Sequence, residues 1–230
     1  MPLSGVIFDF DGVLVNTEPI HLKAYQQVMA DTPLTLETDA YYARYLGYDD
    51  VGVFTAVATD QGVSLSPEEL NRLLDVKGKR FQALLGSNDV LFPGAAVCIE
   101  QLAIKVPLGI ASGALHHEIN EILSHADLRR YFSVVVAAED IDQPKPAPDS
   151  YLRAAKQLRA TLSINADGCF VAIEDSRWGI EAAHEAGLAC IAVTNTYPAT
   201  DLALADATVS GLSEVDFTLL EHVCRRCKSV

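Results

Sequence analysis

The chain has no apolar run long enough to cross a membrane and no concentration of positive charge. None of its 230 residues lies in a stretch approaching the roughly 20 uncharged apolar residues that a spanning helix needs. Lysine and arginine number 17 against 31 aspartates and glutamates, which gives a formal net charge of -14. Nucleic acids and anionic membranes require a basic surface, and the cations here are scattered. We therefore expect neither kind of partner.

A targeting segment and a disulfide framework are also missing from the pattern. Met1-Pro2-Leu3-Ser4 leads directly into an apolar strand, without a basic region or a cleavage site, so we expect a cytoplasmic protein. Five cysteines, an odd count in such a chain, favour reduced thiols. Cys224 and Cys227 lie near His222 and could bind zinc. Because no second C-x-x-C completes such a site, we favour an ordinary tail.

What the chain does have, from Phe92 onward, is a regular alternation of short apolar segments with helix-periodic segments. Together with the first apolar run, the expected strands are residues 4–10, 107–111, 133–137, 169–173, 189–193 and 207–209. The expected helices between them are residues 95–105, 115–125, 149–159 and 177–186. Short apolar strands separated by helices are typical of an α/β fold whose parallel sheet is covered on both faces.

Residues 16–91 interrupt this alternation with a purely helical pattern. Helical spacing predicts a helix over 18–30, and Ser66-Pro67-Glu68-Glu69 reads as a capping box that opens a long second helix. Lys77 falls in the apolar stripe of that helix, beside Leu70, Leu74, Phe81 and Leu84, where an apolar residue is expected. We predict a discontinuous core of residues 1–15 and 92–230, with residues 16–91 inserted as a helical cap.

Polar side chains follow the predicted strands, at the edge where an open parallel sheet binds its ligands. In chain order they are Asp9 and Asp11, Ser112-Gly113, Lys145, and Glu174-Asp175-Ser176. Carboxylates at the end of a buried strand are costly unless a cation lies beside them. The pattern therefore predicts a site for a cation and an anionic group at this edge.

Four segments at these positions carry a family resemblance. They are Asp9-Phe10-Asp11-Gly12-Val13, Ala111-Ser112-Gly113, Lys145-Pro146-Ala147-Pro148-Asp149, and Glu174-Asp175-Ser176 followed by Gly179-Ile180. In this order they resemble the haloacid dehalogenase superfamily of phosphotransferases, most closely its β-phosphoglucomutase-like and phosphoglycolate-phosphatase-like branch. The resemblance spans essentially the whole chain. It implies a Rossmann-like parallel sheet core with an inserted α-helical cap.

The resemblance also implies a role for each acid. Asp9 is expected to attack phosphorus and form an aspartyl-phosphate. Asp11 is expected to protonate the leaving alcohol and then to activate water or a second hydroxyl. Family members that dehalogenate lack an acid at this position, so Asp11 favours phosphoryl transfer. Asp9, Asp175 and the Asp11 carbonyl are expected to hold Mg²⁺, with Glu174 beside the metal or, alternatively, a simple turn acid.

The remaining core positions are expected to bind the transferring phosphoryl group. Ser112 and the Gly113 N–H would hold it at the start of the helix over 115–125, although Ser112 could also serve as the N-cap of that helix. Lys145, between two prolines, would offset the charge of phosphate and nucleophile. A solvated loop lysine is the alternative.

In the cap, the resemblance points to His21, Gly47, Tyr48 and Lys77 as substrate contacts, with His21 as a structural histidine as the alternative. β-Phosphoglucomutases carry an arginine shortly after that glycine to grip a second phosphate, whereas this chain has Asp49 and Asp50 there. We therefore favour a Mg²⁺-dependent phosphatase acting on a small phosphate ester, a sugar phosphate or a phosphoglycolate-like molecule. A phosphomutase is the alternative, and a non-catalytic regulatory protein a minor one. The sequence leaves monomer or dimer open.

Overall fold

The computed structural model describes residues 2–46, 48–85, 90–162 and 168–226. The chain divides into two compact units, each with its own hydrophobic core. The first consists of Met1–Asn16 and Leu91–Val230, and the second of Thr17–Val90. The second unit is thus an insertion that leaves the first shortly after its opening strand.

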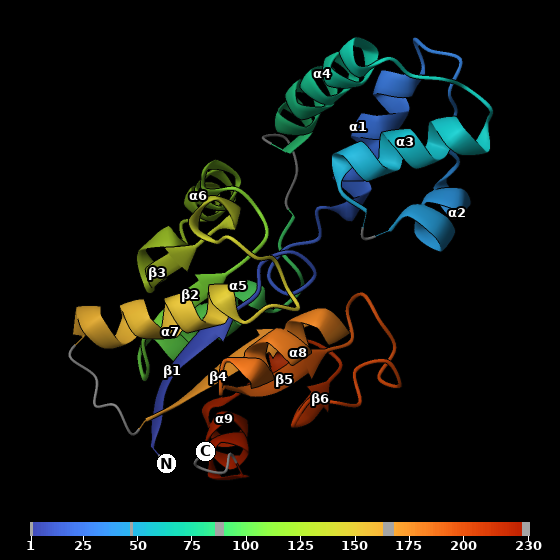
Figure 1. Cartoon of the computed structure of the whole chain (residues 1–230). Coiled ribbons are helices and arrows are strands. Elements are labelled where there is room, and N and C mark those ends of the chain that lie inside the picture. The colour runs from blue at the N-terminus through green and yellow to red at the C-terminus, as the bar shows by residue number, and fades with distance from the viewer. Residues whose placement is uncertain (1, 47, 86–89, 163–167, 227–230) are drawn as a thin grey trace. The chain divides into compact units, whose positions relative to one another are not determined.

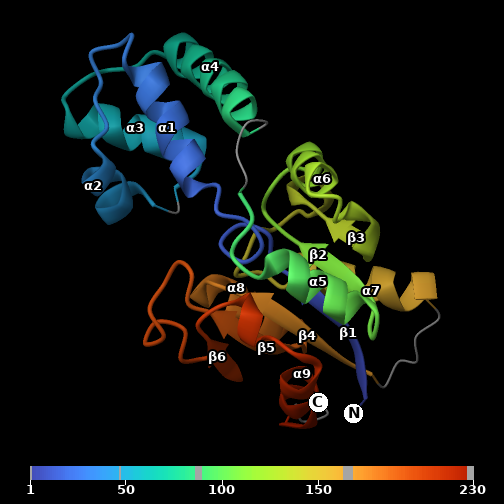
Figure 2. The ribbon, with the colours of Figure 1, turned by 180° about the vertical axis from the view of Figure 1, so that it is seen from behind.

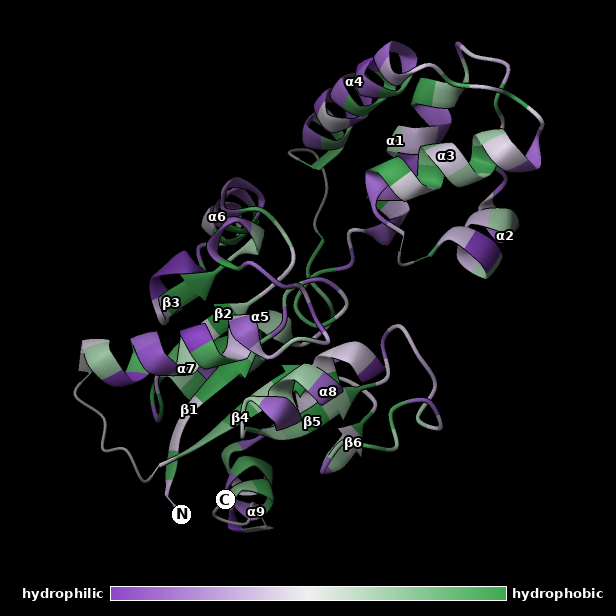
Figure 3. Cartoon of the chain, viewed as in Figure 1, coloured by the Kyte–Doolittle hydropathy of each residue, from purple (hydrophilic) through white to green (hydrophobic). Residues whose placement is uncertain are grey.

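The first unit is built on a parallel sheet (Figure 1). Its strands are β1 (Leu3–Phe8), β2 (Leu108–Ala111), β3 (Phe132–Val136), β4 (Cys169–Glu174), β5 (Ala189–Val193) and β6 (Ala207–Val209). They pair in the order β3-β2-β1-β4-β5-β6, every pair parallel. The central strands are hydrophobic along most of their length (Figure 3) because helices cover both faces. The predicted α/β class with a parallel sheet is confirmed.

Helices lie on both sides of this sheet. They are α5 (Ala95–Ala103), α6 (His116–His125), α7 (Asp149–Leu162), α8 (Arg177–Glu185) and α9 (Phe217–Arg226), with short 3-10 turns at Arg129–Tyr131, Ala138–Asp140 and Leu212–Glu214. α7 and α8 cover one face, where Tyr151, Leu158 and Ile180 share a buried cluster with the strands. α5 and α9 lie on the other face (Figure 2). Strands and helices begin and end within three residues of their predicted bounds, but α9 was not predicted.

The second unit contains α1 (Glu18–Met29), α2 (Thr38–Ala40), a π-helical turn (Tyr41–Tyr45), α3 (Asp50–Asp60) and α4 (Pro67–Leu85), with no strand among its described residues. The expected capping box of α4 forms, with the Ser66 N–H donating to Glu69 and the Glu69 N–H to Ser66 Oγ. The buried stripe of α4 consists of Leu73, Lys77, Phe81 and Leu85. Lys77 and Phe81 of the expected stripe are therefore buried, Leu70 and Leu74 are partly buried against the core of this unit, and Leu84 is partly buried. None of the described helices combines the length and apolar composition that a membrane span requires.

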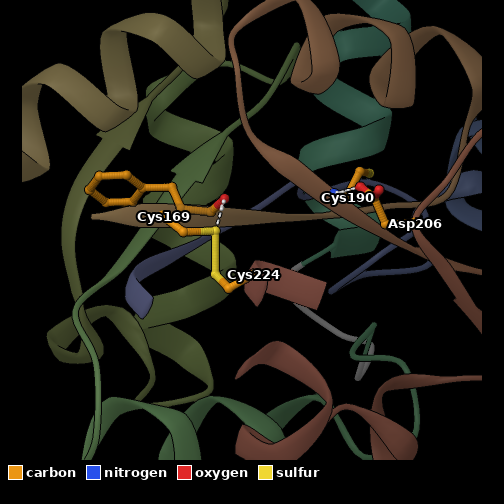
Figure 4. Close-up of a disulfide and its surroundings, with 5 residues drawn as sticks. Cys169, Cys190, Asp206 and Cys224 are labelled. Carbon is orange, nitrogen blue, oxygen red and sulfur yellow. Dashed lines mark hydrogen bonds between the residues drawn. A yellow bond between two sulfur atoms is a disulfide. The ribbon is translucent and has the colours of Figure 1, made fainter. Parts of the chain in front are cut away.

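A disulfide joins strand β4 to helix α9 in the first unit. Cys169, the first residue of β4, is bonded to Cys224 of α9 across 55 residues (Figure 4). The expectation of reduced thiols is therefore wrong for this pair, while Cys98 and Cys190 are free and buried. Because the Cys224 sulfur is engaged in this bond, it is not a free zinc ligand. Cys227 lies outside the described residues.

Candidate active site

Sheet pairing brings the acids after β1 and β4 together. β1 and β4 are neighbours, with Phe8 in register with Ile173. The Asp9 N–H continues the pairing by donating to the Ile173 carbonyl at 2.9 Å. Asp9 therefore lies directly beside Glu174 and Asp175 at the carboxyl edge of the sheet, as the strand pattern predicted.

Lys145 connects these acids although it is far from them in sequence. Its Nζ donates to Asp9 Oδ1 at 2.6 Å and to Glu174 Oε1 at 2.6 Å. The Tyr151 hydroxyl donates to the same Glu174 oxygen at 2.8 Å. The Lys145 side chain is only 16% exposed. The alternative of a solvated loop lysine is wrong.

Glu174 is held on both of its oxygens and is fully buried. Its Oε2 accepts from the Asp175 N–H at 3.1 Å and from the Ser176 hydroxyl at 3.2 Å. A Cβ added at Gly179 would lie 1.9 Å from the Glu174 carboxyl carbon, so only glycine leaves room there. Glu174 is therefore a positioned group of the site, and the alternative of a simple turn acid is wrong.

The site holds three carboxyl groups and one ammonium, and their burial makes the excess of negative charge costly. Asp9, Glu174 and Asp175 each place a carboxylate oxygen within 4.8 Å of the others. Burial, together with the neighbouring carboxylates, raises the pKa of Asp9 well above its ordinary value, although Lys145 opposes the shift. Burial and then Glu174 raise the pKa of Asp175 to about 7. Burial by itself would lower the pKa of Lys145, but Asp9 and Glu174 raise it above its usual range.

These three oxygen donors fit a hard divalent cation. One ammonium faces three carboxylates, so a bound cation would offset the charge that burial makes costly. An all-oxygen ligand set is the one that Mg²⁺ and Ca²⁺ prefer. The acidic cluster predicted from Asp9, Glu174 and Asp175 is thus present in the described residues, and its chemistry fits the metal.

The loop after β1 folds tightly against the segment after β5. Gly12 has a φ of 79°, and a Cβ there would lie 2.0 Å from Asp175 Oδ2. Thr196 hydrogen-bonds the Asp175 side chain, and the Asn195 amide donates to the Gly12 carbonyl at 2.8 Å. Sequence reasoning missed Thr196, Asn195 and Tyr151. The first two follow a predicted strand at the ligand-binding edge, which was a usable signal; Tyr151 had none.

Asp11 and the Ser112-Gly113 pair occupy the same edge. Asp11 is partly buried in the Phe10–Val15 turn and forms a β-bridge with Val15. Ser112 directly follows β2 and is 1% exposed, and its Oγ accepts from the Ala114 N–H at 2.9 Å. α6 begins at His116 with Leu115 at the cap position, so the alternative of Ser112 as N-cap is wrong. A Cβ added at Gly113 would meet no atom within 4 Å, which leaves open space beside its backbone.

Two of the predicted cap residues, His21 and Lys77, lie in a second polar cluster within the inserted unit. Lys77 is 2% exposed and lies 2.8 Å from His21 Nδ1 and 2.6 Å from Asp50 Oδ1. The Tyr25 hydroxyl donates to the same Asp50 oxygen at 2.6 Å. Tyr48 is 54% exposed and joins none of these contacts, and Gly47 lies outside the described residues. Asp50 and Tyr25 were not predicted as members.

The parallel sheet and the lysine-bridged acids at its carboxyl edge define an α/β core with an oxygen-rich acidic site that suits a divalent cation. A family model described as haloacid dehalogenase-like hydrolase matches residues 6–193. The chain therefore belongs to this family, as its motifs indicated.

Two relatives of this chain are named as phosphatases. The fructose-1-phosphate phosphatase YqaB of Escherichia coli is 30% identical over 190 residues, which span 83% of this chain and 96% of the relative. A phosphorylated carbohydrates phosphatase of Thermotoga maritima is 30% identical, spanning 81% of this chain and 82% of that protein. The structure of CbbY from Rhodobacter sphaeroides matches with a TM-score of 0.79 at 24% identity, over 95% of this chain and 99% of that one, a likeness of fold. The prediction of a phosphatase enzyme of this family is confirmed.

Proposed function

We propose that the protein hydrolyses a small phosphorylated metabolite, a sugar phosphate or a phosphoglycolate-like molecule, through a phosphorylated Asp9 and with Mg²⁺. The observation that supports this most directly is the convergence of Asp9, Lys145, Glu174 and Asp175 at the carboxyl edge of β1 and β4. The two named phosphatases both act, by their names, on phosphorylated carbohydrates, which favours the sugar phosphate class.

In the proposed reaction, Asp9 supplies the nucleophile. One carboxylate oxygen attacks phosphorus while the bond to the ester oxygen breaks, and Asp11 gives its proton to the departing alkoxide. Asp11 then removes a proton from water, which attacks the aspartyl-phosphate and releases inorganic phosphate. Lys145, already 2.6 Å from an Asp9 oxygen, offsets negative charge as the phosphoryl group arrives.

The other core residues would bind the phosphoryl group and the metal. Asp9, Asp175 and the Asp11 carbonyl, with Glu174 beside them, would hold Mg²⁺, which when bound supplies a positive charge to the phosphoryl oxygens. Ser112 and the Gly113 N–H lie at the same edge of the sheet, directly after β2, which is the strand next to β1, and would hold those oxygens.

The cap cluster favours a phosphatase over a phosphomutase. A mutase must hold a second phosphate, which requires cations that are not already neutralised. In this chain the Lys77 ammonium lies 2.6 Å from the Asp50 carboxylate, so its charge is balanced inside the cap. His21, Gly47, Tyr48 and Lys77 stay predicted substrate contacts, and we propose that they bind uncharged parts of the substrate.

Replacement of the nucleophile tests the proposal. Asp9→Asn should lower kcat by at least about a thousandfold on a panel of phosphate esters with Mg²⁺, because a carboxamide does not attack phosphorus. The matched control is Asp142→Asn, since Asp142 lies in the loop before Lys145 and precedes it by three residues. Wild-type-like phosphate release by Asp9→Asn would overturn the mechanism.

The mutase alternative has a separate readout. The enzyme is incubated with a hexose 1-phosphate and a hexose bisphosphate, and the amounts of free phosphate and of hexose 6-phosphate formed are both measured. A phosphatase should yield free phosphate as the main product. Accumulation of 6-phosphate without release of phosphate would show that the second phosphate is held after all.

A further inference from the structure

A hollow of about 530 Å³ opens on the first unit. It is lined by two segments: Arg177 and Trp178 from the start of α8, and Tyr197, Thr200 and Asp201 from the β5–β6 connection. Figures 1 and 2 both show that connection running beside α8. No role in the proposed chemistry accounts for these five residues.

Two aromatic rings form a corner in this hollow. Trp178 is 44% exposed, and its ring centroid lies 6.2 Å from that of Tyr197 with the ring planes at 71°. The Arg177 guanidinium carbon lies 5.4 Å from the Trp178 ring centroid. An indole exposed to this extent offers an apolar face that the protein itself leaves uncovered. The corner therefore suits a compact ring with apolar faces.

The rim of the hollow is polar but balanced in charge. Arg177 has no ion-pair partner in the part of the chain that the structure describes, and Asp201 accepts from the adjacent Thr200 hydroxyl at 3.1 Å. One guanidinium, one carboxylate and one hydroxyl can donate to and accept from several hydroxyl groups at once. A second phosphate would face the Asp201 carboxylate. This rim therefore favours a neutral polyhydroxyl group over another anion.

Both walls of the hollow begin at the metal-binding edge. Arg177 follows Asp175 by two residues, and Tyr197 directly follows Thr196, whose side chain hydrogen-bonds Asp175. Two residues span at most about 7 Å of chain. Each wall therefore starts within about 7 Å of backbone from Asp175 or from the residue that hydrogen-bonds it.

We propose that this hollow is a subsite for the sugar ring of the substrate's leaving group, with Trp178 and Tyr197 packing on the ring and Arg177, Thr200 and Asp201 bonding its hydroxyls. The proposal rests on the proposed phosphatase function and narrows it. It assigns the enzyme to cyclic sugar phosphates rather than to short acyclic esters such as phosphoglycolate.

Trp178 allows a direct test of binding, since it is the only tryptophan in the chain. Intrinsic fluorescence is followed in Asp9→Asn protein, which keeps the esters intact, during titration with glucose 6-phosphate, fructose 1-phosphate and ribose 5-phosphate. At least one should give a saturable change, whereas inorganic phosphate should give none. Tyr197→Ala should weaken that binding about tenfold by removing one wall of the corner.

A control and two contrary outcomes complete the titration. Ile104→Ala removes a side chain that is 84% exposed before β2, at the opposite edge of the sheet, and should leave the curve unchanged. No fluorescence change with any of the three sugar phosphates would overturn the proposal. A change with AMP but not with the sugars would overturn it too, in favour of a heterocycle.

Kinetics separate this subsite from the proposed function. The ratio of kcat/KM for the best cyclic sugar phosphate to that for phosphoglycolate should fall about tenfold in Trp178→Ala, mainly through KM, and should not move in Ile104→Ala. If wild-type protein hydrolyses no ester but the fluorescence titration saturates, the phosphatase function fails and the subsite stands. If hydrolysis is normal and the ratio does not move in Trp178→Ala, the subsite fails alone.

Discussion

Lys145 shows how much of the site depends on single side chains. Its ammonium contacts Asp9 and Glu174, and both of those carboxyl groups are largely buried. Lys145→Ala should lower kcat by about 10² to 10³, because the phosphoryl group would then approach an uncompensated carboxylate. Steady-state kinetics check this against Lys156→Ala, which removes an exposed lysine from the neighbouring α7. A kcat within twofold of wild type in Lys145→Ala would contradict the assigned role.

Gly179 tests whether the position of Glu174 matters. An alanine Cβ there would overlap the Glu174 carboxyl group at about 2 Å, so Glu174 must move and lose bonds to the Asp175 and Ser176 backbone. We expect Gly179→Ala to lower stability by more than about 2 kcal/mol and to weaken Mg²⁺ binding. Urea unfolding and calorimetric titration measure the two effects.

The matched glycine is Gly78, in the middle of α4. A Cβ there meets no atom within 4 Å, so Gly78→Ala should leave Mg²⁺ binding unchanged and raise stability by about 0.5 to 1 kcal/mol. Equal behaviour of the two glycine variants would show that the crowding at Gly179 is relieved without cost.

Most of the site could be predicted from the sequence because strand ends are readable from the pattern. Asp9, Ser112 and Asp175 each directly follow a buried strand and Glu174 ends one, and the parallel order brings those ends to one edge. Tyr151 is different, because it lies inside a helix and only the packing of α7 on the sheet directs its hydroxyl to Glu174.

At the scale of elements, β4 links two features that lie at its opposite ends. Cys169 begins the strand and is bonded to α9, whereas Glu174 ends it at the candidate active site. Closing a loop of 55 residues restricts the unfolded chain by up to about 4 kcal/mol in the chain-entropy model. We expect dithiothreitol to lower the urea midpoint of wild-type protein while kcat in the folded state is kept.

The Cys169→Ser/Cys224→Ser double variant is the control for this reduction. It should unfold at the same urea concentration with and without dithiothreitol, near the midpoint of reduced wild type. A wild-type midpoint that does not respond to dithiothreitol would mean that the bond contributes nothing to stability.

In the inserted unit, burial between α1 and α4 keeps His21 in its neutral form. Burial, and then the Lys77 charge, lower the pKa of His21 to about 3, and Lys77 donates toward its Nδ1 at 2.8 Å. In the unfolded chain His21 takes up a proton near pH 6.5, whereas in the folded chain it stays neutral down to about pH 3. The stability that comes from keeping His21 neutral is therefore complete above pH 6.5 and is lost as the pH falls toward 3.

This imbalance predicts the pH dependence of unfolding. Between pH 7 and pH 5, wild type should lose about 2 kcal/mol more stability than His21→Gln, whose amide does not titrate. Urea titrations at the two pH values measure the difference. Parallel losses in both proteins would show that His21 accepts its proton in the folded cap.

The bounds of most helices and strands could be predicted from the sequence. The side-chain contacts between different helices and strands could not. Strand and helix periods differ, so the alternation from Phe92 onward gave five strands and four helices of the first unit, and the first apolar run gave β1. Helix α9 was missed although Phe217, Leu220 and Val223 recur at helical spacing. The pairing of Cys169 with Cys224 and the Lys77–Asp50 contact depend on packing between elements, which periodicity does not encode.

At the scale of the whole molecule, the insertion leaves and re-enters the first unit beside the Phe10–Val15 turn. Asp11 bridges to Val15, and Val15 in turn bridges to Leu91, where the chain re-enters the first unit. The Phe92 N–H donates to the Leu14 carbonyl at 3.0 Å. The segments of the first unit on either side of the insertion are therefore both bonded to the turn that holds the proposed general acid.

Charge balance across the first unit makes metal binding a stability question as well. Asp9, Glu174 and Asp175 are crowded within 4.8 Å in a chain of net charge -14, with Lys145 as their shared cation. Mg²⁺ at a hundredfold excess over its Kd should stabilise wild type by about 2.7 kcal/mol. Asp175→Asn removes one of the repelling carboxylates, so without metal it should be more stable than wild type, and it should gain little from Mg²⁺.

Thermal unfolding of both proteins in EDTA and in Mg²⁺ gives the four values. A metal-free Asp175→Asn protein less stable than metal-free wild type would show that the hydrogen bond from Thr196 outweighs the repulsion, and that the acidic cluster is balanced without a cation.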